Sequence, residues 1–324
     1  MKTRIAVLIL DGFLAVTALW GALLVVPQLP ASLLRSGPFA DFTIPAFGLG
    51  VIGILAAVGA VAVFWRPPVA AIASILAGGA IIVFEIVEAI AVGSLLKAPS
   101  ELNDQGYVAV WLQPLYAIVG MGIVWLAFFG IYRPWQLRWG ATDDEVKSEL
   151  PGDHIVRHPV FDATRAVTVN ARPQDIWPWI VQLGFNRAGW YTYDLLDNFG
   201  RRSAERIVPE LQHLDVGDVV PLGPGKDAGP RVLEVEPARW TVWGDKTGQQ
   251  ASWTWVLSPR HDGSTRLLTR VRAPVSWRKP LTAVWLLLFE FADFPMMRKC
   301  MLGIKRRAEA LQRSSAANQV MGAQ

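Results

Sequence analysis

Four long apolar stretches dominate the first part of the chain. They cover about residues 5–26, 43–65, 69–96 and 108–132. Each reaches the roughly 20 residues that a helix needs to cross the hydrocarbon core of a bilayer. Because backbone N–H and C=O groups find no water in hydrocarbon, each stretch is expected to be helical. The pattern therefore predicts an N-terminal four-helix transmembrane bundle in residues 1–132.

The pattern changes after residue 132. Residues 133–160 are predicted to form an interfacial linker, in which Thr142 and Glu145 have the spacing of a helix-capping box. Short β-type runs and helical runs follow. The predicted elements are a strand at 163–169, helices at 173–183 and 191–198, strands at 219–222, 231–236, 240–244, 252–258 and 266–272, and a helical stretch at 281–311. This order predicts a separate α+β domain over 161–311, with an antiparallel sheet and a long C-terminal helix, and then a disordered tail at 312–324.

The composition also separates the two parts. The whole chain is 52% hydrophobic and only 18% charged, which is apolar for a soluble protein. Residues 1–132 contain five Lys or Arg and six Asp or Glu, a net charge of −1, whereas residues 133–324 contain 26 and 21, a net charge of +5. The two parts are therefore expected to lie in different solvents.

Basic residues near the ends of the apolar stretches predict the orientation. One set of flanks contains Lys2, Arg4, Arg66, Arg133 and Arg138. The opposite loops contain fewer cations and are partly acidic. By the positive-inside rule, we expect a multi-pass protein of the inner (plasma) membrane with both termini and the soluble domain in the cytoplasm. The single cysteine, Cys300, fits a reducing compartment.

Two acidic residues lie well inside the third apolar stretch. Glu85 and Glu88 are three residues apart, and therefore on one face of a helix. A charged carboxylate in hydrocarbon is costly, so both should face the bundle interior, with at least one protonated. Gln113 and Tyr116 of the fourth stretch are the expected partners. Two alternatives stay open: a site for a proton, a cation or a polar headgroup, and a buried polar clamp that sets helix register.

The second part of the chain resembles a known superfamily. The segments that carry the resemblance are 139–143, 176–179, 187–194, 203–210 and 302–307. They are similar to the SRPBCC, or START-like, superfamily, and most similar to bacterial members labelled polyketide cyclase/dehydrase or lipid-transport-like, over about residues 135–311. The resemblance implies a helix-grip fold, in which a curved antiparallel sheet wraps a long C-terminal helix around an apolar cavity. It implies no catalytic set, because carriers, sensors and enzymes share this scaffold.

Aromatic residues are concentrated in this second part, which holds eleven of the fifteen tryptophans. Trp253 and Trp255 lie on one face of a strand, since strand side chains alternate. The candidate ligand-binding residues are Arg187, Trp190, Tyr191, Tyr193, Asp194, Trp253 and Trp255. The aromatic rings would form the cavity walls, and the Arg187 and Asp194 side chains would orient a polar head. The alternatives are plain core packing for the tryptophans and a surface ion pair for the two charged residues.

The absence of several known motifs argues against some classes of function. The sequence contains no nucleophile elbow, P-loop or zinc-finger spacing, and His154 and His158 lie in a non-helical, Pro-containing stretch. We therefore expect no metal and no cofactor. Basic clusters near Arg201 and Lys299 are attributed to anionic lipid headgroups, with no nucleic-acid partner. The apolar stretch 281–294 is expected to lie in the membrane interface or to dock on the bundle, with Pro295 separating it from the final helix.

Three functional hypotheses follow. The first is a membrane-anchored module that binds a lipid, isoprenoid or polyketide-like molecule in the cavity of the soluble domain. The second is a cyclase- or aromatase-like enzyme, in which Asp194 would act with Tyr193 or Arg187. The third makes the bundle the functional unit through Glu85 and Glu88, regulated by the soluble domain. The sequence leaves the ligand, any turnover and the oligomeric state open.

Overall fold

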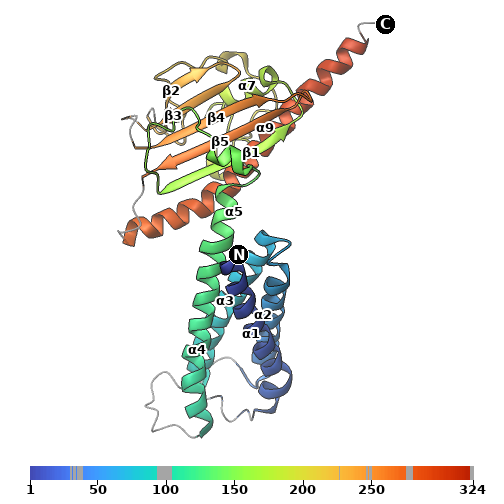
Figure 1. Cartoon of the computed structure of the whole chain (residues 1–324), viewed down its shortest axis with the longest axis vertical. Helices are drawn as coiled ribbons and strands as arrows, with labels where there is room; N and C mark the ends of the chain where they lie inside the picture. Colours follow the sequence, from blue (N-terminus) through green and yellow to red (C-terminus); the bar gives the residue numbers. More distant parts are fainter. Residues whose placement is uncertain are drawn as a thin grey trace. The chain divides into compact units, whose positions relative to one another are not determined.

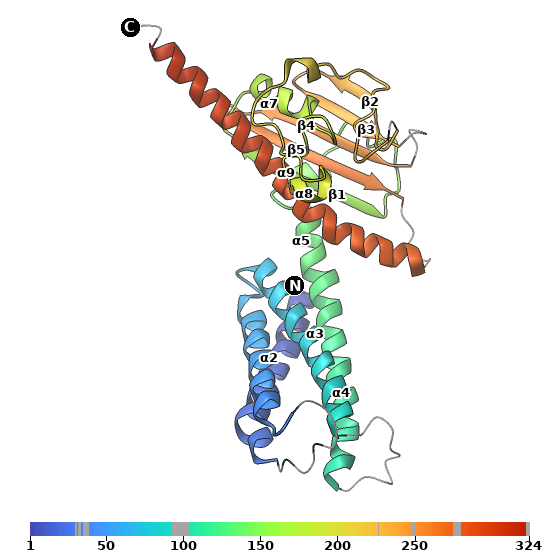
Figure 2. The same cartoon turned by 180° about the vertical axis from the view of Figure 1, so that it is seen from behind.

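The computed structural model describes residues 1–29, 31, 34, 39–92, 104–225, 227–245, 247, 250–274 and 280–321. The chain divides into two compact units, Met1–Trp135 and Gln136–Gln324. Figures 1 and 2 show the helices and strands of each unit from opposite sides.

The described residues of the first unit form four long helices. They are α1 (Lys2–Trp20), α2 (Thr43–Ala62), α3 (Pro67–Val92) and α4 (Asp104–Ala127). Short segments extend two of them: η1 (Gly21–Val25) and η2 (Val26–Gln28) follow α1, while η5 (Phe128–Tyr132) leads into α5 (Arg133–Leu137). The segments long and apolar enough to cross a membrane are Lys2–Gln28, Thr43–Ala62, Pro67–Ala91 and Leu112–Leu137. Four predicted apolar helices are thus confirmed. The predicted end of the third, at 93–96, lies outside the described residues.

Large aliphatic side chains cover the outer faces of these helices. Ile9, Leu23, Ile54, Val61 and Ile118 are all more than half exposed. A helix of a soluble protein keeps such residues on the face turned to the core and places polar residues on the other face. Their outward position is that expected of helices surrounded by hydrocarbon, as in an integral membrane protein.

Glycines allow the helices of the first unit to approach closely. A Cβ atom placed on Gly78 of α3 would lie 2.7 Å from the backbone oxygen of Gly120 in α4, and the same holds in reverse. A Cβ on Gly53 of α2 would lie 2.7 Å from the Leu19 side chain of α1. Small residues at helix contacts are what holds membrane bundles together, because lipid provides no hydrophobic force between helices.

The second unit contains a five-stranded antiparallel sheet. Its strands are β1 (Phe161–Val169), β2 (Arg231–Glu236), β3 (Trp240–Gly244), β4 (Ser252–Pro259) and β5 (Thr265–Ala273). Their order in the open sheet is β1-β5-β4-β3-β2. The helical segments are α6 (Asp143–Lys147), α7 (Pro173–Val181), α8 (Asp194–Asp197), η6 (Pro209–Leu211) and α9 (Pro280–Met321). The predicted antiparallel sheet and C-terminal helix are confirmed.

The core of the second unit lies between one face of the sheet and the helices α7 and α9. Ile176 and Ile180 of α7 pack there with Met301 and Ile304 of α9. All four side chains are at most 1% exposed. The i, i+4 spacing within α7 places its two isoleucines on one side of the helix, which the sheet then covers.

The C-terminal helix departs from the sequence-based expectation in two ways. Pro295 was expected to separate two helical segments, but α9 continues through it. Figures 1 and 2 show that α9 changes direction along its length; a proline inside a helix produces such a kink because its ring clashes with the preceding turn. The helix also continues to Met321, whereas residues 312–324 were expected to be disordered. Helix-forming Ala and Gln residues extend a helix already nucleated by packing; residues 322–324 lie outside the described chain.

Two short predicted elements also differ. The predicted strand at 219–222 forms only an isolated bridge between Val219 and Arg231. Val220 and Leu222 still donate backbone hydrogen bonds to Pro230 and Ala228. Pro221 and Pro230 have no N–H to donate, so the segment does not form a regular strand. The predicted helix at 191–198 is reduced to the four residues of α8.

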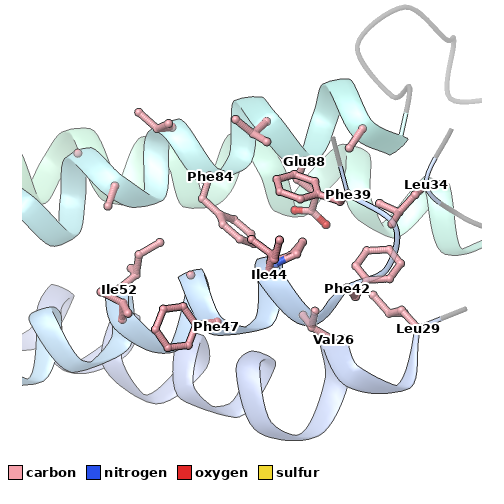
Figure 3. A pocket seen from close by; sticks show the side chains of 18 of the residues that line it. Val26, Leu29, Leu34, Phe39, Phe42, Ile44, Phe47, Ile52, Phe84 and Glu88 are labelled. Atoms are coloured by element: carbon pink, nitrogen blue, oxygen red, sulfur yellow. The ribbon is translucent and has the colours of Figure 1, made fainter. Parts of the chain in front are cut away.

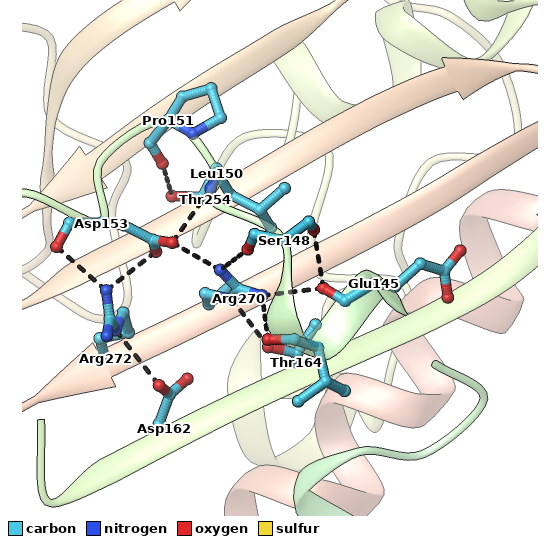
Figure 4. A network of polar contacts seen from close by, with 11 residues as sticks. Glu145, Ser148, Leu150, Pro151, Asp153, Asp162, Thr164, Thr254, Arg270 and Arg272 are labelled. Atoms are coloured by element: carbon cyan, nitrogen blue, oxygen red, sulfur yellow. Dashed lines mark hydrogen bonds and ion pairs between the residues drawn. The ribbon is translucent and has the colours of Figure 1, made fainter. Parts of the chain in front are cut away.

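The segment after the first unit packs on the face of the sheet opposite the core. Thr142 and Glu145 form the predicted capping box of α6. Arg270 of β5, which is 3% exposed, makes five hydrogen bonds, four of them to the segment 145–153. Figure 4 shows how Arg270 and Arg272 converge on Asp153 of this segment. Residues 142–153, predicted as part of a linker, are therefore attached to the sheet.

Candidate functional site

An apolar groove of about 670 Å³ lies between α2 and α3 of the first unit. One end of the groove is closed by η2, the residue after it and the segment before α2, through residues such as Val26, Leu29, Phe39 and Phe42. Phe47 and Ile52 of α2 and Phe84 of α3 form its walls, as Figure 3 shows. This volume falls within the range of pockets that hold drug-sized ligands.

Glu88 is the polar exception among the described residues that line the groove. Figure 3 shows its carboxyl group directed into the groove, beside Phe39. The Glu88 side chain is half-buried. An apolar lining with one carboxyl group matches an amphipathic ligand, in which one hydrogen-bonding group ends an apolar chain.

Two glycines leave room for the groove. Gly48 of α2 and Gly79 of α3 belong to its lining. A Cβ atom placed on either would meet no atom within 4 Å. The adjacent Gly78 faces α4 instead. Gly78 therefore permits the close contact of α3 with α4, and Gly79 leaves the groove unobstructed.

Glu85 supports Glu88 from within the bundle. The two side chains are hydrogen-bonded to each other. Glu85 is only 6% exposed. A hydrogen bond between two carboxyl groups requires a proton on one of them, so the pair carries at most one negative charge. The two glutamates thus interact with each other on one face of α3, and their role as a functional site stays a prediction.

The predicted partners of the glutamates lie on α4. Gln113 is buried, with 9% of its surface exposed. The ring of Tyr116 stacks on that of Phe13 in α1, with ring centroids 6.1 Å apart. Neither residue belongs to the described lining of the groove. Their role as partners of the glutamates stays a prediction.

A second buried carboxylate lies elsewhere in the bundle. The Ser74 hydroxyl of α3 donates to Oδ2 of Asp11 in α1, at 2.5 Å, and both side chains are fully buried. Oδ1 of Asp11 has no hydrogen-bond partner among the described residues. Gly59 permits this arrangement, because a Cβ there would lie 2.6 Å from the Asp11 carboxylate. Asp11 and Ser74 could be recognised in the sequence as polar residues within apolar stretches. Their contact could not be predicted, because they are 63 residues apart.

In the second unit, three predicted ligand-binding residues form one aromatic cluster. The rings of Trp190 and Trp253 stack, with centroids 5.5 Å apart, and Trp255 lies 5.6 Å from Trp253. Trp243, which sequence analysis did not single out, contacts all three rings. Trp190, Trp243 and Trp255 are at most 5% exposed. These indoles occupy the face of the sheet that was expected to line a cavity, and ligand binding there stays a prediction.

Tyr191 and Asp194 lie instead at a polar cleft of about 400 Å³, next to α9. The Tyr191 hydroxyl receives a hydrogen bond from Gln182, at 2.8 Å, and donates to the backbone of Trp179. Burial raises the pKa of Tyr191 well above its ordinary value. Asp194 accepts a hydrogen bond from Ser203, at 2.5 Å. These contacts hold a turn in place and leave both side chains engaged within the protein.

The side chains of Arg187 and Tyr193 make contacts in different parts of the second unit. The Arg187 guanidinium donates to the backbone oxygens of Val181 and Leu211. Its burial lowers the pKa of Arg187. Tyr193 is 42% exposed and lies under the ammonium group of Lys299, 3.7 Å from its ring centroid. The seven predicted residues therefore do not converge on one site.

The stretch 281–294 is described only in part. Leu288 and Phe291 are exposed, whereas Glu290 is 1% exposed and accepts a hydrogen bond from Gln136 at 3.2 Å. Phe289 packs edge-on against Phe161 of β1. This part of α9 thus belongs to the second unit, and its location at the membrane interface stays a prediction.

No protein-family model and no curated protein matches the chain. Within the described ranges, no group of three His, Cys, Asp or Glu side chains is placed to hold a metal ion.

Proposed function

We propose that this protein is an integral membrane protein that binds an amphipathic lipid in the groove between α2 and α3. The observation that carries the proposal is a groove of about 670 Å³ whose described lining is apolar except for Glu88. The ligand class is an apolar chain with a hydroxyl or ammonium group, because only a hydrogen-bond donor complements a carboxylate.

The dimensions of the groove support a chain-like ligand. On α3 the lining extends from Ile75 to Ala91, which is about 24 Å along a helix axis at 1.5 Å per residue. Glu88 is close to the end of α3, so a head bound there would lie near the membrane surface while the tail follows the helix inward. With the termini in the cytoplasm, as the basic flanks predict, this end of the bundle faces the outer leaflet.

We further propose that the second unit is a helix-grip domain of the SRPBCC type in the cytoplasm. The support is the order of its elements, β1, α7, α8, then β2 to β5, then α9, around one antiparallel sheet. Its role in ligand binding has weaker support than that of the groove, because Trp190, Trp243, Trp253 and Trp255 pack together over the sheet face. We therefore assign the lipid to the membrane unit.

The proposal is tested by the lipids that co-purify with the full chain. Gly79→Leu and Gly48→Leu would place a side chain in the open space of the groove. Gly12→Leu is the matched control, since a Cβ on Gly12 also meets nothing within 4 Å and Gly12 is not part of the described lining. Quantitative mass spectrometry is expected to find one hydroxyl- or amine-bearing lipid enriched with the wild type and with Gly12→Leu. Both groove variants should lose it. Equal lipid content in all four proteins would refute the groove as a binding site.

A further inference from the structure

An exposed apolar segment of the second unit lies beside a group of cations. Leu195, Leu196 and Phe199 are 76%, 67% and 67% exposed. They fall within five residues, in and directly after α8. Proteins seldom expose three large apolar side chains so close together unless another surface contacts them.

The backbone of this segment is held in place. The Gly200 N–H donates to the Asp194 carbonyl oxygen at 2.7 Å, which closes the turn. Asn198 is 2% exposed, and its side chain accepts from the Asn186 N–H and donates to the Arg201 carbonyl oxygen. The apolar side chains are therefore presented by an ordered turn.

Phe199 adds a sign of strain to the turn. Its φ angle is +49°, a left-handed conformation that a bulky residue rarely adopts. Its ring contacts Phe185 edge-on, with centroids 5.1 Å apart, yet most of the side chain stays exposed. The fold thus maintains an unfavourable backbone conformation together with an exposed phenyl ring.

The charges around the turn are separated by sign. Within the turn the acidic side chains are bonded to the protein: Asp194 accepts from Ser203, and Asp197, 8% exposed, accepts from Thr192. The exposed Glu205, after the turn, is paired with Arg306 and Arg307. The basic side chains Arg201, Arg202 and Lys299 are exposed. Exposed apolar residues with outward cations match a bilayer surface, where anionic headgroups lie above the acyl chains.

We propose that the turn 193–202 is a membrane-docking element, which inserts Leu195, Leu196 and Phe199 into the bilayer interface while Arg201, Arg202 and Lys299 bind anionic headgroups. A bilayer is always within reach, because the same chain contains four helices able to cross one. Docking does not depend on the lipid groove. It would hold the second unit against the membrane surface.

The test uses the full chain in nanodiscs of phosphatidylcholine and phosphatidylglycerol. Cys300 is replaced by Ala, and Leu195→Cys or Leu196→Cys is labelled with an environment-sensitive fluorophore. Both sites are largely exposed, so neither substitution removes core packing. Val216→Cys, at a site 65% exposed in the loop before β2, is the control.

Docking predicts a blue-shifted emission at positions 195 and 196, quenched by lipids that carry a spin label near the headgroup, and neither effect at 216. Arg201→Gln with Arg202→Gln should reduce the quenching, as should nanodiscs without phosphatidylglycerol. Emission at 195 and 196 equal to that at 216 would overturn the proposal. A blue shift without quenching by spin-labelled lipid would also overturn it, in favour of a protein contact.

Discussion

The side chains of Glu85 and Glu88 are hydrogen-bonded to each other in an apolar helix, and only Glu88 lines the groove. One carboxyl group is therefore buried as a support, and the other faces the space in which a ligand would lie. A buried partner that shares a proton limits the charge of the site. It also orients Glu88, since a hydrogen-bonded side chain loses much of its rotational freedom.

Replacing Glu88 by Gln is expected to weaken lipid binding without unfolding the bundle. Gln preserves the size and hydrogen-bonding capacity of the side chain but removes the negative charge. Hydrogen bonds to charged groups contribute about 1.5–3 kcal/mol and neutral ones about 0.5–1.5 kcal/mol, so affinity should fall roughly five- to ten-fold. The measurement is the lipid retained per protein after purification. Asp11→Asn, which changes a buried carboxylate outside the groove, should retain wild-type lipid; unchanged retention in Glu88→Gln would contradict the assigned role.

Gly78→Ala is expected to destabilise the first unit, whereas Gly79→Ala is not. At Gly78 a Cβ would lie 2.7 Å from the backbone of Gly120, but at Gly79 it meets nothing within 4 Å. Forcing an atom into a packed contact costs about 1–3 kcal/mol, while Ala in place of an uncontacted helical Gly contributes up to about 1 kcal/mol of stability. Thermal unfolding of both variants in detergent, followed by circular dichroism, gives the comparison. Shifts of the same sign and size would argue against close contact of α3 with α4.

Arg270→Ala is expected to detach the segment 145–153 and destabilise the second unit by about 3 kcal/mol or more. Arg270 is nearly fully buried, and its removal would break five hydrogen bonds and leave Asp153 with Arg272 as its remaining cationic partner. Arg239→Ala is the control, because the Arg239 pair with Glu236 is exposed and should contribute less than about 1 kcal/mol. Urea unfolding monitored by tryptophan fluorescence measures both. Equal midpoints for the two variants would show that Arg270 is dispensable.

Asp245 is expected to make stability depend on acidic pH. Burial opposes its ionisation, but hydrogen bonds from Thr247, Gln250 and Ala251 outweigh this and lower the pKa of Asp245 from 3.8 to about 2. A depressed folded-state pKa stabilises the protein above pH 3.8, and this stabilisation is lost as the pH falls toward 2. Allowing for solvent screening, the contribution is about 1 kcal/mol.

The comparison of wild type with Asp245→Asn isolates this effect. The wild type should be the more stable protein at pH 6, and the difference in unfolding free energy should shrink between pH 4 and pH 2. A difference that stays constant across this range would mean that the Asp245 carboxylate is not preferentially stabilised in the folded state.

Much of the architecture could be predicted from local patterns. The strands β2 and β3 have the bounds that alternation and flanking Pro, Gly and Asp residues predicted. Thr142 and Glu145 form the capping box expected from their spacing. Pro295 shows where local reasoning fails: proline disfavours a helix interior, but the packing of α9 on the sheet supports a helix on both sides of it.

The candidate site was harder to predict, because it depends on contacts between distant segments. Glu85 and Glu88 were recognisable as polar residues in an apolar helix. The groove also depends on Phe39 and Phe42, which close one end, and on Gly79, which has no side chain to fill it. No spacing in the sequence predicts that these residues come together. Trp190, by contrast, was predicted to line a cavity; packing placed it against Trp243 and Trp253.

The sequence by itself determined which segments can cross a membrane, because hydrocarbon requires about 20 consecutive apolar residues in helical form. It also determined which side chains share a strand or helix face, since the periods of 2 and 3.6 residues follow from backbone geometry. Only the tertiary structure decided which of those faces meet. The contact of Asp11 with Ser74, the filling of one sheet face by indoles and the open groove beside Glu88 all follow from how separate elements pack, which depends on the fit of whole surfaces.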